Sequence, residues 1–327
     1  MSEVKLLCAS DLHGSNICFT KLTLLATRMR PAAVLVGGDL TGKETIFVSE
    51  VGRDRYVYVN GDARETAVSD RELKELRRLW GNKGFYSAIV PDELRKNKDA
   101  PERLKIKRQL IRTRLTQWLR YAESAFAPAG IRLLLVPGND DPLDVDVDIS
   151  SVGWVENVDG GQTLVEEHPV AGLGYSNETP WHCPRELSEA EITVRLNKLI
   201  SGMSVDDVSR LVLVSHVPPF GSGLDIAPEI SGKKKDNEKV EIDQEDAGLS
   251  IVPGGQSEVG SKAVRAFIEN HHPMLVVSGH CHDSPGFQRL GTTLCINPGS
   301  TYGSGVLRTA IVLLKDNAVL GYQSLNW

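Results

Sequence analysis

Short, strongly apolar runs that end abruptly in polar residues constrain the fold of this chain more than any other feature. The run LLLVPGNDDP at 133–142 delivers an amide and two carboxylates directly after a buried strand. Polar groups are costly at such a place unless they are hydrogen-bonded or bind a ligand. The chain opens with a β-α-β pattern, because a strand at 4–9 and a strand at 32–38 flank an amphipathic helix at 17–29 that Pro31 stops. This opening predicts an α/β fold.

The same alternation continues along the chain. Apolar runs return at 131–138, 210–216 and 273–280, and helices are expected near 188–201 and 261–271. Three short alternating strands, TTLCIN, LRTAIVLL and AVLGYQSL, then close the chain. We therefore expect five buried strands in an α/β arrangement, with no internal repeat.

Each of the five buried strands ends in side chains that can bind a metal ion. They are Asp11 and His13 after the first strand, Asp39 after the second, Asn139 after the third, His216 after the fourth, and His280 and His282 after the fifth. The carboxyl ends of strands in an open α/β sheet line one crevice, so these side chains can converge. Seven ligands exceed the needs of one tetrahedral zinc ion. Two divalent ions about 3.5–4 Å apart would use them all and would activate a water molecule for phosphoester hydrolysis.

The motifs DLHG, GGDL, GND, SHVPP and GHCH, in this order, resemble the calcineurin-like metallophosphoesterase superfamily. The segments GLGYSNETPWHCPRELSEAEI, SEVGSKAVRAFIENHHPMLVVSGHCHDS and INPGS look like the small predicted phosphoesterases related to bacterial cyclic-nucleotide phosphodiesterases. The similarity covers residues 1–42 and 131–327. It implies a four-layer α/β/β/α sandwich with the site at the edge of the sheets.

The resemblance also implies a role for each candidate ligand. Asp11, His13 and His282 would hold the first metal ion, Asp39 would bridge, and Asn139, His216 and His280 would complete the second site. The ions would be two of Mn, Fe, Ni or Zn, since imidazole suits these metals. The nucleophile in such enzymes is a bridging hydroxide, so no covalent intermediate is expected.

One position departs from that pattern. Many superfamily members follow the G-N pair with a histidine that helps to protonate the leaving oxygen, whereas position 140 here is Asp. This departure predicts a bias toward activated leaving groups or a substitute acid. Asp140 could serve only if nearby metal ions do not keep it ionised, and His182 is the other candidate because TPWHCP resembles a loop at the mouth of the site. Cys281 is expected to point away from the metals, and Asp283 to orient a ligand histidine.

Residues 43–130 do not fit the compact family pattern and are interpreted as a largely helical insertion, an inserted cap or docking subdomain within a single domain of 1–327. We expect a hairpin, a short helix near 70–80 and a long helix near 101–126. One face of the long helix is apolar and should dock: Leu104, Ile111, Leu115, Trp118 and Ala122. Basic residues flank this face: Lys105, Lys107, Arg108, Arg112 and Arg114. These cations either attract a phosphate-rich substrate or nucleic acid, or form a solvated face beside a docking or dimer stripe, and we favour the second interpretation. The mixed charges of 231–248 indicate a mobile charged loop.

The composition limits the classes of partner. A net charge of −6 and an isoelectric point near 5.8 give no global field for nucleic acid or anionic membranes. The five scattered cysteines favour a reducing cytoplasm, and no apolar run approaches the roughly 20 residues of a membrane span. The preferred function is hydrolysis of a small phosphorylated molecule or nucleotide, as a diester or a monoester. A nuclease and a non-catalytic binding module are the alternatives.

Overall fold

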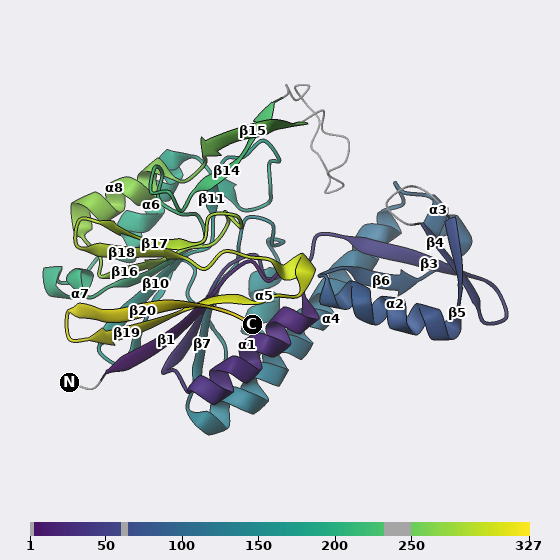
Figure 1. Cartoon of the computed structure of the whole chain (residues 1–327), viewed down its shortest axis with the longest axis horizontal. Helices are drawn as coiled ribbons and strands as arrows, with labels where there is room; N and C mark the ends of the chain where they lie inside the picture. Colours follow the sequence, from purple (N-terminus) through teal and green to yellow (C-terminus); the bar gives the residue numbers. More distant parts are fainter. Residues whose placement is uncertain (1–2, 60–64, 232–249) are drawn as a thin grey trace.

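Two six-stranded sheets pack face to face in the computed structural model, and helices cover both outer surfaces (Figure 1). The structure describes residues 3–59, 65–231 and 250–327. The order of layers is helix, sheet, sheet, helix. The predicted α/β class is therefore confirmed.

The first sheet has the order β20-β19-β1-β2-β7-β8. Its strands are β1 (Val4–Ala9), β2 (Ala33–Gly37), β7 (Arg132–Val136), β8 (Glu156–Asn157), β19 (Arg308–Lys315) and β20 (Ala318–Asn326). The strands β1, β2, β7 and β8 run parallel, and β19 and β20 extend the sheet with antiparallel pairing. Because β1, β2 and β7 are covered on both faces, they are continuous apolar runs rather than alternating ones.

The second sheet has the order β17-β18-β16-β13-β10-β9. Its strands are β9 (Gln162–Val165), β10 (His168–Leu173), β13 (Val212–Ser215), β16 (Leu275–Val277), β17 (Gly286–Leu290) and β18 (Thr293–Asn297). The strands β10, β13, β16 and β18 are parallel. The five buried strands of the sequence thus divide between two sheets, β1, β2 and β7 in one and β13 and β16 in the other.

Three apolar layers hold the sandwich together. Between the sheets, side chains such as Leu6, Leu35, Val214 and Val277 are almost fully buried. The outer helices are α1 (Asn16–Met29), α4 (Pro101–Phe126) and α5 (Val145–Ser150) on the first sheet, and α6 (Glu189–Leu199) and α8 (Lys262–His271) on the second. Burial of these apolar surfaces is the main stabilising term of such a fold.

Smaller elements complete the chain. They are α7 (Val205–Ser209), η1 (Ala127–Ala129), η3 (Tyr302–Ser304), the pair β11 (Ser176–Asn177) and β12 (Glu186–Leu187), and the hairpin β14 (Ile226–Ser231) with β15 (Ser250–Glu258). The expected mobile loop at 231–248 lies outside the described residues except for its first residue. Among the helices that the structure describes, none combines the length and the apolar character needed to cross a membrane.

The insertion contains a four-stranded sheet as well as its helices. Its strands β3 (Thr45–Gly52), β4 (Arg55–Val59), β5 (Glu65–Ser69) and β6 (Tyr86–Ile89) form one sheet, and its helices are α2 (Asp70–Asn82), α3 (Asp92–Lys96) and α4. The expected hairpin is β3 and β4, and both predicted helices are present. The strands β5 and β6 were not predicted, because runs of four or five residues show too little periodicity and β6 pairs with the distant β3.

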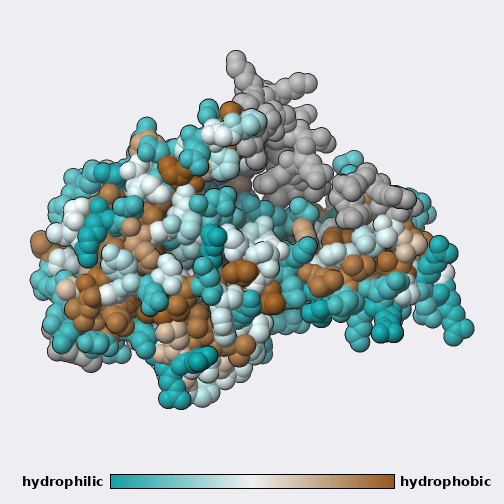
Figure 2. Space-filling view, viewed as in Figure 1, coloured by the Kyte–Doolittle hydropathy of each residue, from teal (hydrophilic) through white to brown (hydrophobic). Residues whose placement is uncertain are grey.

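The long helix α4 belongs to both parts of the molecule. Its second half packs on α1, with Trp118 stacked on Phe19 at 4.4 Å between ring centroids. Four of the five predicted docking residues are buried, whereas Leu104 is 47% exposed. On the face shown in Figure 2, hydrophilic side chains line the lower edge of the insertion, where α2 lies in Figure 1.

Candidate metal centre

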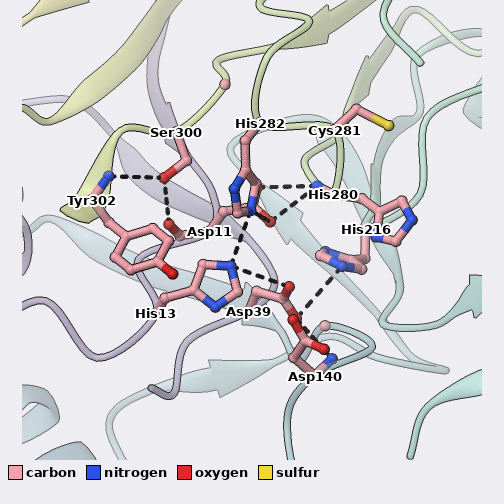
Figure 3. Close-up of polar contacts among 12 residues, drawn as sticks. Asp11, His13, Asp39, Asp140, His216, His280, Cys281, His282, Ser300 and Tyr302 are labelled. Atoms are coloured by element: carbon pink, nitrogen blue, oxygen red, sulfur yellow. Dashed lines mark hydrogen bonds and ion pairs between the residues drawn. The ribbon is translucent and has the colours of Figure 1, made fainter. Parts of the chain in front are cut away.

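The seven candidate ligands lie close together; Figure 3 labels six of them, and the seventh, Asn139, contacts His216 and His280. They lie in the loops that follow β1, β2, β7, β13 and β16, as expected from the strand ends. Five of the seven are buried, and the rings of His280 and His282 are partly exposed. The site thus combines loops that follow strands of both sheets.

The backbone is unusual at four of these positions. Asp11, His13, Asp39 and His280 have φ angles of 53°, 40°, 49° and 65°, in the left-handed region. Asp and His tolerate this region better than most residues but still at a cost, and such strain concentrates at functional sites. Backbone hydrogen bonds fix the turns, since the N–H of Asp11 donates to the carbonyl of Gly38 at 3.0 Å.

Two glycines of the motifs are required by close approach. A Cβ on Gly138 would lie 2.1 Å from Oδ1 of Asp39, and a Cβ on Gly279 would lie 2.4 Å from Oδ2 of Asp11. Both glycines leave room for a carboxylate that comes from a different strand. The GND and GHCH motifs therefore require glycine for steric reasons, whether or not the site binds a metal.

The first cluster is formed by Asp11, His13, Asp39 and His282, whose ligand atoms all lie within 4.8 Å of one another. The Nε2 atoms of His13 and His282 face each other at 3.0 Å. The same atoms face carboxylate oxygens, His13 toward Oδ2 of Asp39 at 3.5 Å and His282 toward Oδ1 of Asp11 at 3.4 Å. Neutral imidazoles have too few protons for these contacts, but a cation among the four groups would satisfy all of them.

The second cluster uses the other oxygen of Asp39. His216 donates from Nδ1 to the carbonyl of Gly37 at 2.8 Å, which leaves the lone pair of its Nε2 on the opposite side. That Nε2 faces Oδ1 of Asn139 at 2.8 Å and Oδ1 of Asp39 at 3.6 Å. Nδ1 of His280 faces the same amide oxygen at 3.0 Å. Asp39 thus lies between two groups of potential ligands.

The electrostatics of the centre favour bound cations. Burial, together with the carboxylates of Asp140 and Asp11, raises the pKa of Asp39 well above its usual range. Burial lowers the pKa of His13 and, together with His216, lowers that of His280 to about 3. The imidazoles of His13 and His280 are therefore neutral, the form that ligates metals, and the crowded carboxylate of Asp39 is a group that a divalent ion would relieve.

Asp140 has partners that sequence reasoning did not identify. Its Oδ2 lies 2.5 Å from Nζ of Lys43, and its Oδ1 accepts from the thiol of Cys183 at 3.2 Å. Burial would raise the pKa of Asp140, but the Lys43 ammonium holds it well below its usual range. Asp140 is thus an ionised, engaged carboxylate and a poor proton donor. Lys43, in the loop four residues after Asp39, has no motif that would have revealed it.

His182 lies in a loop that does reach the centre, but through its neighbour. The contact is made by Cys183, whereas the His182 side chain is exposed and has a φ angle of 50°. Among the residues that the structure describes, His182 forms no hydrogen bond or ion pair with a candidate ligand. Its role as an acid stays a prediction.

Other residues position the candidate ligands. The buried carboxylate of Asp141 accepts hydrogen bonds from the backbone N–H groups of Leu40, Thr41 and Gly138 at 2.8–3.0 Å. These bonds tie the loop that follows β2 to the loop that follows β7. The hydroxyl of Ser300 donates to the carbonyl of Asp11 at 2.7 Å. Sequence reasoning missed both, because each acts through backbone contacts with distant loops.

Two expectations concern residues around His282. The buried side chain of Cys281 points away from the other site residues in Figure 3, as strand alternation predicted. Asp283 is exposed, and no contact with a ligand histidine is present among the described residues. The ring of Tyr302, which was not predicted, lies 4.6 Å from that of His13 between centroids.

The insertion fixes two of the loops that carry candidate ligands. On α4, the guanidinium of Arg114 donates to the carbonyls of Gly14 and Phe85, each at 2.8 Å, and lies over the ring of Tyr86. The hydroxyl of Tyr86 in turn accepts from the N–H of Gly42 at 3.1 Å. The loops that follow β1 and β2 are therefore anchored to β6 and α4.

Comparisons with known proteins support the fold. No family model matches the sequence. The uncharacterized protein MJ1162 of Methanocaldococcus jannaschii is 31% identical over 170 residues, which is 51% of this chain. The chain thus spans less than two thirds (64%) of that relative's length.

Solved structures are similar over the whole chain. One crystal structure has a TM-score of 0.55 at 16% identity and covers 99% of both chains. TT1561 of Thermus thermophilus has a TM-score of 0.52 at 15% identity, again over 99% of both chains. These two likenesses show the fold alone. A third structure, described as a novel archaeal phosphodiesterase, has a TM-score of 0.33, too low to support an inference.

Proposed function

We propose that this chain is a metal-dependent phosphoesterase of the calcineurin-like kind that its motifs resemble. The observation that carries the proposal is the position of Asp39 between two groups of imidazole nitrogens and oxygen acceptors that face one another at short distances. Such a donor set fits two divalent cations that share one carboxylate. A phosphodiester of a small molecule or nucleotide is the proposed substrate.

The residues divide between the two proposed ions. One would be held by Asp11, His13 and His282, the other by Asn139, His216 and His280, and Asp39 would bridge them. When bound, such ions lower the pKa of a water molecule and offset phosphoryl charge. Manganese, iron, nickel and zinc all suit this mixture of imidazole and oxygen ligands.

Hydrogen bonds within the chain fix the positions of the proposed ligands. The hydrogen bond from His216 to Gly37 fixes the ring and its tautomer, in the manner of outer partners of metal ligands. The bonds that Asp141 accepts keep two ligand loops together. Because Asp140 is ionised and paired, proton donation to the leaving oxygen falls to another group or to solvent.

The alternatives are less well supported. A nuclease would use the basic residues of α4. However, Arg112 pairs with Asp148 on α5, and Arg108 pairs with Asp144, the residue before α5. Arg114 binds backbone carbonyls. A non-catalytic binding module would not need seven converging ligands. A small substrate, a cytoplasmic location and association of copies through the insertion remain parts of the proposal.

Metal titration of stripped protein tests the proposal. Hydrolysis of bis-p-nitrophenyl phosphate and p-nitrophenyl phosphate would be followed as Mn²⁺, Ni²⁺, Zn²⁺ or Mg²⁺ is added, and bound metal would be counted. We expect two ions per chain and cleavage of the diester in preference to the monoester. Binding of metal without cleavage of either ester would contradict the enzyme and favour the binding module.

A further inference from the structure

A lysine stands at the edge of the candidate metal centre. Nζ of Lys43 lies 2.5 Å from Oδ2 of Asp140, and the two side chains are 31% and 11% exposed. The backbone N–H of Asp140 donates to Oδ1 of Asp39 at 3.0 Å. Asp140 therefore links Lys43 to the carboxylate that the two ligand clusters share.

The contacts make Asp140 an anchor and leave Lys43 with free donors. One carboxylate oxygen of Asp140 is taken by the ammonium and the other by the Cys183 thiol. An ammonium has three N–H donors. Among residues 3–59, 65–231 and 250–327, Nζ of Lys43 makes no other hydrogen bond or ion pair, and its side chain reaches solvent. Donors are thus available to a molecule that enters the site.

The insertion fixes the backbone from which Lys43 extends. The N–H of Gly42 is bound by the Tyr86 hydroxyl at 3.1 Å. A Cβ on Gly42 would lie 2.0 Å from the carbonyl oxygen of Gly84, so the loop is pressed against the insertion. A cation held by a rigid loop and an anchored carboxylate is preorganised, and preorganised charge costs no rearrangement during a reaction.

We propose that Lys43 is a catalytic residue that donates a hydrogen bond to the leaving-group oxygen, with Asp140 as its positioning residue. The inference rests on the proposed phosphoesterase function. Non-bridging phosphoryl oxygens already have partners in the proposed ions, whereas the leaving oxygen gains charge only as its bond to phosphorus breaks. A donor that acts on this late charge raises the rate rather than the affinity.

The step balances without proton transfer from the lysine. The oxygen of water forms a bond to phosphorus, and one of the two water protons passes to solvent. The bond from phosphorus to the leaving oxygen breaks, and its electron pair stays on that oxygen. Lys43 stabilises the new negative charge and keeps its own proton, and the leaving oxygen takes a proton from solvent. Esters with poor leaving groups would depend most on this help.

A comparison of two leaving groups tests the assignment. Metal-loaded full-length protein would be compared with Lys43→Met and with Lys83→Met, an exposed lysine in the nearby insertion, on methyl phenyl phosphate and methyl p-nitrophenyl phosphate. For Lys43→Met we expect kcat to fall about 10²-fold on the phenyl ester and less than about tenfold on the p-nitrophenyl ester. KM and the metal count should stay unchanged, and Lys83→Met should match the unmodified protein.

A second pair of variants tests the positioning role. Asp140→Asn should lower kcat with the same dependence on the leaving group, and the double variant Lys43→Met/Asp140→Asn should be no slower than Lys43→Met alone. Lys43→Arg should restore part of the rate on the phenyl ester. A carboxylate with only a structural role would give losses that add and that are equal for both esters.

The outcomes separate the two claims. If the unmodified protein binds metal and hydrolyses neither ester, the proposed function fails and the inference fails with it. If it hydrolyses both esters while Lys43→Met loses equal rate on each, or loses none, the phosphoesterase stands and the leaving-group role of Lys43 is overturned.

Discussion

The metal-centre loops and the helix α4 are both rich in charged and polar groups, yet they satisfy them differently. At the centre, acceptors face acceptors, as Nε2 of His216 faces the oxygens of Asn139 and Asp39. On α4, the guanidinium of Arg112 pairs with Asp148 at 2.6 Å, and other arginines have partners too. Charged groups that are paired within the chain indicate a structural role. Several converging groups that the chain leaves unmatched indicate a ligand.

Removal of the shared carboxylate should give the largest effect. For Asp39→Asn we expect loss of metal binding and a fall of at least about 10³-fold in metal-dependent hydrolysis. Because burial and neighbouring carboxylates raise the pKa of Asp39, the metal-free variant should be at least as stable as the metal-free parent. Metal counting, rates and denaturant unfolding would measure these changes.

The matched control is Asp144→Asn, which removes an exposed partner of Arg108 and should leave metal content and rate unchanged. An Asp39→Asn variant that keeps two ions and a rate within about tenfold of the parent would refute the dinuclear centre.

A partly buried cation whose donors bind backbone carbonyls should matter for stability. Arg114→Met would leave the carbonyls of Gly14 and Phe85 without their partner, and we expect the free energy of unfolding to fall by about 2–3 kcal/mol. Arg112→Met, on the same helix but half exposed, should cost less than about 1 kcal/mol. Urea unfolding of both variants measures the difference, and equal costs would break the contrast between the two arginines.

His168, the first residue of β10, sharpens the comparison because its ring lacks hydrogen-bond partners but lies outside the metal centre, with only the Glu167 carboxylate at 3.9 Å from its Nε2 among the described residues. Neither ring nitrogen has a hydrogen-bond partner among the described residues, and burial lowers its pKa. The unfolded chain therefore takes up a proton near pH 6.5 while the folded chain does not, so stability falls as the pH drops below about 6.5. The loss is at most about 1.4 kcal/mol per pH unit until the folded pKa is reached.

Unfolding of metal-loaded protein and of His168→Phe between about pH 7.5 and 5.5 isolates this contribution. The variant should lose less stability than the parent as the pH falls, with no change in metal content. Parallel pH profiles would show that His168 does not titrate on unfolding.

The smallest effect is expected on the basic face of α4. Neutralising Lys105 and Arg108 together, as Lys105→Gln/Arg108→Gln, should leave hydrolysis of a small diester unchanged. If the parent binds single-stranded or duplex DNA, the slope of log affinity against log salt concentration should differ between variant and parent by no more than about one unit. A shift of about two units, with lost affinity, would instead support the nuclease.

The sequence indicated the candidate ligands because each lies within a few residues of the end of an apolar strand. Asp11, Asp39 and His216 could be identified from local patterns, and the ends of parallel strands bring such residues together. The helix α4 was predicted for the same reason, since its period is local. Those features depend on neighbours within a few residues.

Other features depend on contacts between distant segments. The pairing of Lys43 with Asp140, the hold of Tyr86 on Gly42 and the strand β6 each join residues far apart in the chain. In the TPWHCP loop, the turn at His182 directs Cys183 rather than the histidine to the centre. This loop has no periodicity that would indicate which of the two adjacent side chains faces inward.

The sequence by itself determined the α/β class and which residues end the buried strands, because hydrophobic periodicity and strand polarity act locally. The tertiary structure alone decided how the five strands divide between two sheets, that the insertion anchors two ligand loops, and that Asp140 is paired with a cation. Those properties arise from packing and from charges that approach across long stretches of chain, where burial sets both the geometry and the pKa.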